Sequence, residues 1–211
     1  KIDLPLASEN ARASSYLKNR KLDPDKFYYA ERFKHFCNTI KPTFTNVRDE
    51  HARIVIPMYD SNKRLIGLQG RALDGFVQPK YLTLMLVEDH PKVYGFDTID
   101  ETKQVYVTEG PFDSTFIDNS IAMCGSDVDL SGYGDLEFTY VFDNEPRNRE
   151  IVSKITKSIE KSHKVVIFPT QIREKDINDM VLAGHDVNSL LESNTYTGLK
   201  AKLKLQTWKK V

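Results

Sequence analysis

The chain has 211 residues, 40% of them hydrophobic, so it is long enough to bury one large core or two small ones. Its 30 basic and 30 acidic residues give a formal net charge of zero. Overall charge is therefore excluded as the means of holding a nucleic acid, and any such partner has to bind a local basic patch.

Cysteines and apolar runs set the expected compartment. Cys37 and Cys124 are far apart and neither belongs to a C-x-x-C pair, so the sequence contains no zinc ribbon. It has no apolar run long enough to cross a bilayer and no leader-like start. We expect a reduced, cytoplasmic protein with no membrane partner. Because the first residue is Lys1 rather than methionine, we also expect a fragment of a longer protein.

The first half of the chain predicts a short helix and a hairpin. Residues 8–21 show helical spacing, with Ser8 as a plausible cap. Residues 54–59 and 65–70 are strand-like, and the segment between them has turn composition.

From about residue 103 short apolar runs alternate with helix-like segments. The runs are at 105–108, 121–124, 139–142 and 165–168. Most are apolar throughout, as is typical of strands buried on both faces. Segments 112–119 and 147–161 between them are helix-like. This order predicts an α/β fold, a parallel sheet with helices on both sides.

Acidic residues follow three of these runs, where the chain leaves the sheet. They are Glu109 and Asp113 after the first run, Asp143 and Glu145 after the third, and Asp176 and Asp179 after the fourth. Any one of them alone would more often be a helix cap. Carboxylates that converge would repel one another, and Mg²⁺ relieves such repulsion because it prefers oxygen ligands. Three clusters together favour a metal site.

These clusters also carry a family resemblance. The segments that carry it are Glu109-Gly110-x-x-Asp113, Asp143-x-Glu145 and Lys175-Asp176-x-Asn178-Asp179. They resemble the three acidic motifs of the Toprim domain, which is shared by primases, topoisomerases and some nucleases. Upstream, residues 53–57, 67–71, 80–82 and 92–95 are similar in order and spacing to the catalytic core of bacterial-type DNA primases.

The resemblance implies an architecture and an activity. A mixed α+β subdomain would occupy residues 1–100, a Toprim-like domain 101–193, and a basic tail or helix 194–211. The activity would be synthesis of short RNA primers on single-stranded DNA from ribonucleoside triphosphates, with Mg²⁺ or substituting Mn²⁺. In this family a zinc ribbon precedes the core, so the resemblance implies such a domain upstream of the present sequence.

Roles for the acids follow from the same resemblance. Asp143, Glu145 and Asp176 would hold metal, and Glu109 would be a further ligand or a proton acceptor. Asp113 and Asp179 would complete the shell. The family usually has aspartate where Glu145 stands, and many members have a second acid in place of Asn178, which puts the affinity of the second metal in doubt.

The resemblance also assigns a basic set. Arg71, Lys80 and Lys92 would contact the incoming nucleotide and the template backbone. Alternatively they are ordinary solvated cations, as most of the 30 basic residues are expected to be. Arg53, at a strand start, is expected only to support the fold.

Two rival functions use the same residues. A Toprim nuclease or topoisomerase fragment would cut DNA with these acids, although the upstream primase-like motifs have no role in a nuclease. The other rival is a non-catalytic nucleic-acid-binding module.

The end of the chain predicts a basic amphipathic helix. Ala201, Leu205 and Trp208 recur at helical spacing, and five lysines occur after Gly198 with no acid. It resembles the end of primases of T-even-like phages, which work with a separate replicative helicase in the host cytoplasm. The helix either packs Trp208 on the sheet or docks a helicase or single-stranded DNA.

Overall fold

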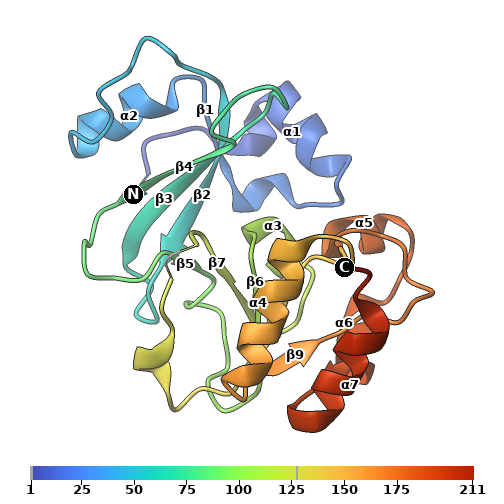
Figure 1. The fold of residues 1–211 in the computed structure, drawn as a ribbon. Helices are drawn as coiled ribbons and strands as arrows, with labels where there is room; N and C mark the ends of the chain where they lie inside the picture. Colours follow the sequence, from blue (N-terminus) through green and yellow to red (C-terminus); the bar gives the residue numbers. More distant parts are fainter. Residues whose placement is uncertain (1, 127) are drawn as a thin grey trace. The chain divides into compact units, whose positions relative to one another are not determined.

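A computed structural model describes residues 2–126 and 128–211 (Figure 1). The chain divides into two compact units, Lys1–Asp97 and Thr98–Val211. Among the described residues, no helix has the length and apolar character needed to span a bilayer.

The first unit contains a four-stranded sheet in the order β1-β2-β3-β4, with all neighbours antiparallel. Its elements are η1 (Ala7–Glu9), α1 (Ala11–Lys18), η2 (Pro24–Lys26), β1 (Tyr28–Ala30), α2 (Phe33–Ile40), β2 (Arg53–Tyr59), β3 (Leu65–Ala72), β4 (Tyr81–Met85) and β5 (Val93–Tyr94). The predicted hairpin is confirmed as β2 and β3. Buried Asp60 closes its turn by accepting hydrogen bonds from the backbone N–H groups of Asn62 and Arg64, both at 2.9 Å.

The first helix begins later than predicted. Asn10, not Ser8, caps α1, since its side chain accepts a hydrogen bond from the N–H of Ala13 at 3.0 Å. Residues 7–9 form a 3₁₀ turn, so the chain becomes α-helical only at Ala11.

Helix α2 closes the core of the first unit. Its Phe33 and Cys37 pack with Val55, Leu68 and other apolar side chains of the sheet. Burial, followed by the charge of Glu50, raises the pKa of the Cys37 thiol to about 12, so this cysteine behaves as a core residue. Gly70 lets the ring of Phe33 approach β3, because a Cβ atom there would lie 2.8 Å from it.

The second unit contains the predicted parallel sheet. Its strands lie in the order β10-β9-β8-β6-β7, and all pairs are parallel except β10 with β9. Its elements are β6 (Val105–Thr108), α3 (Pro111–Ser114), β7 (Ser120–Met123), η3 (Ser131–Tyr133), β8 (Phe138–Val141), α4 (Arg149–Glu160), β9 (Lys164–Val166), α5 (Ile177–Leu182), α6 (Val187–Ser193), β10 (Thr195–Tyr196) and α7 (Gly198–Trp208). The predicted α/β fold class is confirmed.

Helices cover both faces of this sheet, as predicted. Val165 packs in one apolar cluster with α4 and α7, whereas Val166 packs in another with α5 and α6. Successive residues of a strand point to opposite faces, so two neighbours of β9 serve two separate cores. Helices α4 and α7 lie side by side on the first of these faces (Figure 1).

One predicted helix is shorter than expected. The helix predicted at residues 112–119 is α-helical only over Pro111–Ser114. The hydroxyl groups of Ser114 and Thr115 donate to carbonyl groups three residues earlier, and the next backbone N–H groups also bond three residues back. These local bonds compete with the α-helical pattern and end it.

Candidate active site

The candidate site lies where the parallel strands of the second unit end. Glu109 directly follows β6, and Asp143 comes two residues after β8. Asp176 is the N-cap of α5, after the loop that leaves β9. The carboxyl ends of parallel strands meet at one edge of a sheet, so residues distant in sequence reach the same place.

The charge on Asp143 is disfavoured at this edge. Burial is the largest cause, and the negative charges of Glu109, Asp176 and Glu145 add to it. Together they raise the pKa of Asp143 from its ordinary value of 3.8 to about 6, against the opposing charge of Lys175. Three of the predicted acids therefore lie within electrostatic range of Asp143.

Two lysines lie among these acids. The Nζ atom of Lys154, on α4, donates to Glu109 Oε1 at 2.6 Å and lies 3.1 Å from Glu150. Lys175 Nζ lies 3.5 Å from Glu145 Oε2 and 4.0 Å from Asp143 Oδ2. The negative charge of Glu145, and to a smaller extent that of Asp143, raises the pKa of Lys175.

Two acids of the predicted set, Asp113 and Asp176, accept hydrogen bonds from backbone N–H groups. Asp113 Oδ1 accepts from the backbone N–H of Asn178 at 2.9 Å and so joins α3 to α5. Asp176 Oδ1 accepts from the N–H of Asp179 at 2.8 Å, which is a cap interaction. Asn178 is buried and Asp179 is exposed. For Asp176 the cap role and the predicted ligand role are compatible, because a carboxylate has two oxygens.

The donor set suits a hard divalent ion. Within residues 2–126 and 128–211 no three acidic, histidine or cysteine side chains are gathered closely enough to hold an ion by themselves. Mg²⁺ usually needs only one or two carboxylates, with water and substrate phosphates completing its shell. A half-buried carboxylate with other acids close by, as Asp143 is, provides this kind of site.

The basic residues predicted from the resemblance lie in the first unit and differ in exposure. Arg71 is only 7% exposed; its Nε donates to the hydroxyl of Tyr16 at 2.8 Å and its Nη1 to that of Tyr81. Lys80 is exposed, with Nζ 5.7 Å from the ring centre of Tyr81. Lys92 is half-buried.

Arg53 has a structural environment. It is 2% exposed and donates to the carbonyl oxygens of Gly70, Pro79 and Lys80 at 3.0–3.1 Å. These bonds hold the segment that carries Lys80 against β3.

Lys154 was not predicted from the sequence. The residue that it contacts, Glu109, is 45 positions away, and only the i, i+4 spacing with Glu150 gave a local signal. Lys175 belonged to the third motif, but no role was predicted for it.

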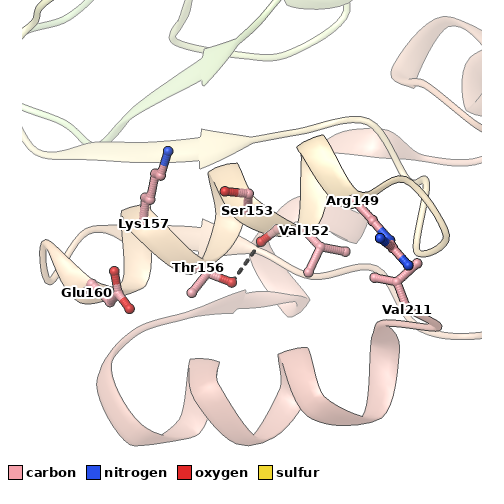
Figure 2. Close-up of a pocket in the computed structure, with 7 residues that line it drawn as sticks. All are labelled: Arg149, Val152, Ser153, Thr156, Lys157, Glu160 and Val211. Carbon is pink, nitrogen blue, oxygen red and sulfur yellow. Dashed lines mark hydrogen bonds between the residues drawn. The ribbon is translucent and has the colours of Figure 1, made fainter.

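A surface pocket lies on α4, lined by residues outside the predicted site (Figure 2). Figure 2 shows Val211 beside Arg149 at one end of α4 and Glu160 at the other end, with Thr156 donating to the carbonyl of Val152 at 2.8 Å. Glu160 is the one acid among the residues that line it.

The fold of this chain matches that of solved catalytic cores of bacterial DNA primases. The RNA polymerase domain of Mycobacterium tuberculosis primase DnaG matches with a TM-score of 0.67 at 17% identity, covering 90% of this chain and 78% of that one. A DnaG primase catalytic domain bound to single-stranded DNA matches with a TM-score of 0.61 at 16% identity, covering 87% and 72%.

Sequence similarity leads to a particular relative. The chain is 30% identical over its whole length to the DNA primase of Enterobacteria phage T4, and it spans 64% of the length of that protein. No protein-family model matches the chain. The resemblance to primases, and to those of T-even-like phages, is thus confirmed.

Proposed function

We propose that this chain is the RNA polymerase domain of a DNA primase, with a Toprim-type acidic site. The observation that carries the proposal is the edge of the parallel sheet, where Asp143 lies among Glu109, Glu145 and Asp176. The primase-like fold and the similarity to a phage primase support it. The reaction is attack by the 3′-hydroxyl of one template-paired ribonucleotide on the α-phosphate of the next, with release of pyrophosphate.

The acids of the second unit hold the reacting groups in this proposal. Asp143, Glu145 and Asp176 would hold Mg²⁺, or Mn²⁺ in its place, and Glu109 would be a further ligand or would accept the proton of the attacking hydroxyl. When bound, the ions would neutralise the negative charge of the triphosphate. Lys154 would share Glu109 with such an ion, since its Nζ bonds one of the two carboxylate oxygens.

Nucleic acid and nucleotides would bind through the basic set. Exposed Lys80 is suited to a phosphate contact, and half-buried Lys92 is a second candidate. Arg71 donates hydrogen bonds to the hydroxyl groups of Tyr16 and Tyr81, and from this fixed position it would contact the incoming nucleotide or the template backbone. A similar catalytic domain with single-stranded DNA bound supports a DNA template as the partner.

A replicative helicase is a further proposed partner, in the cytoplasm of the phage host. The buried side of α7 leaves an outer face with Leu199 72% and Leu203 60% exposed, beside exposed Lys200, Lys202 and Lys204. Exposed leucines with lysines between them suit an acidic, apolar groove.

Incubation with single-stranded DNA, four ribonucleotides and Mg²⁺ tests the proposal. Short RNA products that disappear in Asp143→Asn, but persist in the exposed-site control Asp118→Asn, are expected. Cleaved DNA in place of RNA would establish the nuclease alternative. DNA binding with neither product would establish the binding module.

A further inference from the structure

Asn144 lies between two of the proposed metal ligands and is itself buried, with 8% exposure. Its side-chain amide donates to the carbonyl oxygens of Ile172 and Glu174, at 3.1 and 3.0 Å. Its backbone N–H donates to the carbonyl of Lys175 at 2.6 Å. Three bonds from one residue therefore join the loop after β8 to the loop that leads to Asp176.

The amide oxygen of Asn144 has a partner from the end of the chain. Trp208 Nε1 donates to Asn144 Oδ1 at 3.0 Å, in a buried contact between residues 64 positions apart. An indole N–H can only donate, so it holds the amide with its oxygen toward Trp208 and its NH₂ group toward the loop. The tryptophan thereby determines which way Asn144 points.

Helix α7 is well suited to this task because packing fixes it. Trp208 and Leu205 belong to the same apolar cluster as Ile155 of α4. Just beyond the helix, the N–H of Lys210 donates to the carbonyl of Pro146 at 2.8 Å. The end of the chain thus contacts the acidic loop on both sides of Glu145.

We propose that Asn144 and Trp208 are positioning residues for the acidic site. They hold the loop carrying Asp143 and Glu145 at a set distance from the loop that presents Asp176. The inference rests on the proposed function, since it concerns the geometry that the same acids offer to a divalent ion. Partners of metal ligands typically change metal affinity by about 10- to 100-fold when they are removed.

Trp208→Phe and Asn144→Ala test the proposal in the whole chain. The first keeps an aromatic ring in the apolar cluster but removes the donor; the second removes the side-chain bonds but keeps the backbone N–H. Ile159→Ala is the matched control, because Ile159 of α4 is buried in the same cluster, lies outside α7 and does not take part in the bonds of Asn144. The dissociation constant of Mn²⁺ is measured by electron paramagnetic resonance. Hydrogen exchange of the backbone N–H of residue 144 is followed without metal.

Both test variants should weaken Mn²⁺ binding by about tenfold or more. They should also accelerate hydrogen exchange of the backbone N–H of residue 144. The control should lose thermal stability and keep the wild-type dissociation constant. Unchanged Mn²⁺ affinity in either folded test variant, or an equal loss in Ile159→Ala, would overturn the positioning role and leave the proposed function standing. A wild-type chain that binds no Mn²⁺ would overturn the proposed function, and this inference with it.

Discussion

Replacing Asp143 with asparagine should stabilise the metal-free protein at neutral pH. The carboxylate is held near Glu109, Asp176 and Glu145, and its side chain is only 29% exposed. Asparagine has nearly the same shape as protonated aspartate and carries no charge. The substitution therefore removes a charge that is disfavoured first by burial and then by the neighbouring acids, while the packing of the loop is kept.

The size of the effect follows from the pKa of Asp143. A rise from 3.8 to about 6 means that the folded state keeps a proton that the unfolded state has already released between these pH values. The free energy of unfolding of the wild type therefore falls as pH rises through this window and is lowest above pH 6. Each pKa unit corresponds to roughly 1.36 kcal/mol, so a difference of about two gives an upper value of about 3 kcal/mol for the stabilisation of Asp143→Asn over the wild type.

Urea unfolding in EDTA at a series of pH values measures this difference. Asp143→Asn should exceed the wild type by up to about 3 kcal/mol at pH 7.5, and the two should converge near pH 4. Asp118→Asn, at an exposed acid, should follow the wild type throughout. Saturating Mn²⁺ should then stabilise the wild type, by about 2.7 kcal/mol at a hundred times its dissociation constant, and the variant much less.

Two results would refute the reasoning. If Asp143→Asn is no more stable than the wild type at pH 7.5 without metal, burial and the neighbouring acids do not disfavour the charge of Asp143 as the structure indicates. If Mn²⁺ stabilises both proteins equally, Asp143 is not a ligand.

Three further predictions concern other parts of the chain. Lys80→Ala should weaken binding of single-stranded DNA and make the slope of log affinity against log salt shallower by about 0.7, with Lys26→Ala as the exposed control; equal slopes would make Lys80 an ordinary surface cation. Arg53→Met should lower the free energy of unfolding by about 3 kcal/mol because it leaves three carbonyl groups without their charged donor, and a loss below 1 kcal/mol in a urea titration would contradict this. Deletion of residues 198–211 removes Ala201, Leu205 and Trp208 from the core, so a large fall in the melting temperature and aggregation are expected; an unchanged melting temperature would show that α7 is only a docking element.

Much of the fold could be predicted from the sequence because its signals are local. Runs of apolar β-rich residues alternating with helical spacing predicted the parallel sheet, and the acids after three of the runs were predicted to meet at one edge of it. Ala201, Leu205 and Trp208 were predicted to share a face, and all three are buried. Such patterns depend on neighbours in the chain, so tertiary contacts are not needed to read them.

Local bonds that compete with one another were harder to predict. Ser8 and Asn10 are both residues that cap helices well. Because residues 7–9 form a 3₁₀ turn, the α-helix begins after Asn10, which is the cap. The hydroxyl bonds of Ser114 and Thr115 shortened α3 in the same way.

Only the tertiary structure decided the environment of the charged residues. The sequence shows that Arg71 is basic, but burial between Tyr16 and Tyr81 follows from the packing of α1 on the first unit's strands. The Lys154–Glu109 pair and the Asn144–Trp208 bond join positions 45 and 64 residues apart. Charge and hydrogen-bonding energies depend on distance and on exclusion of water, and both are set by which elements pack together rather than by their order in the chain.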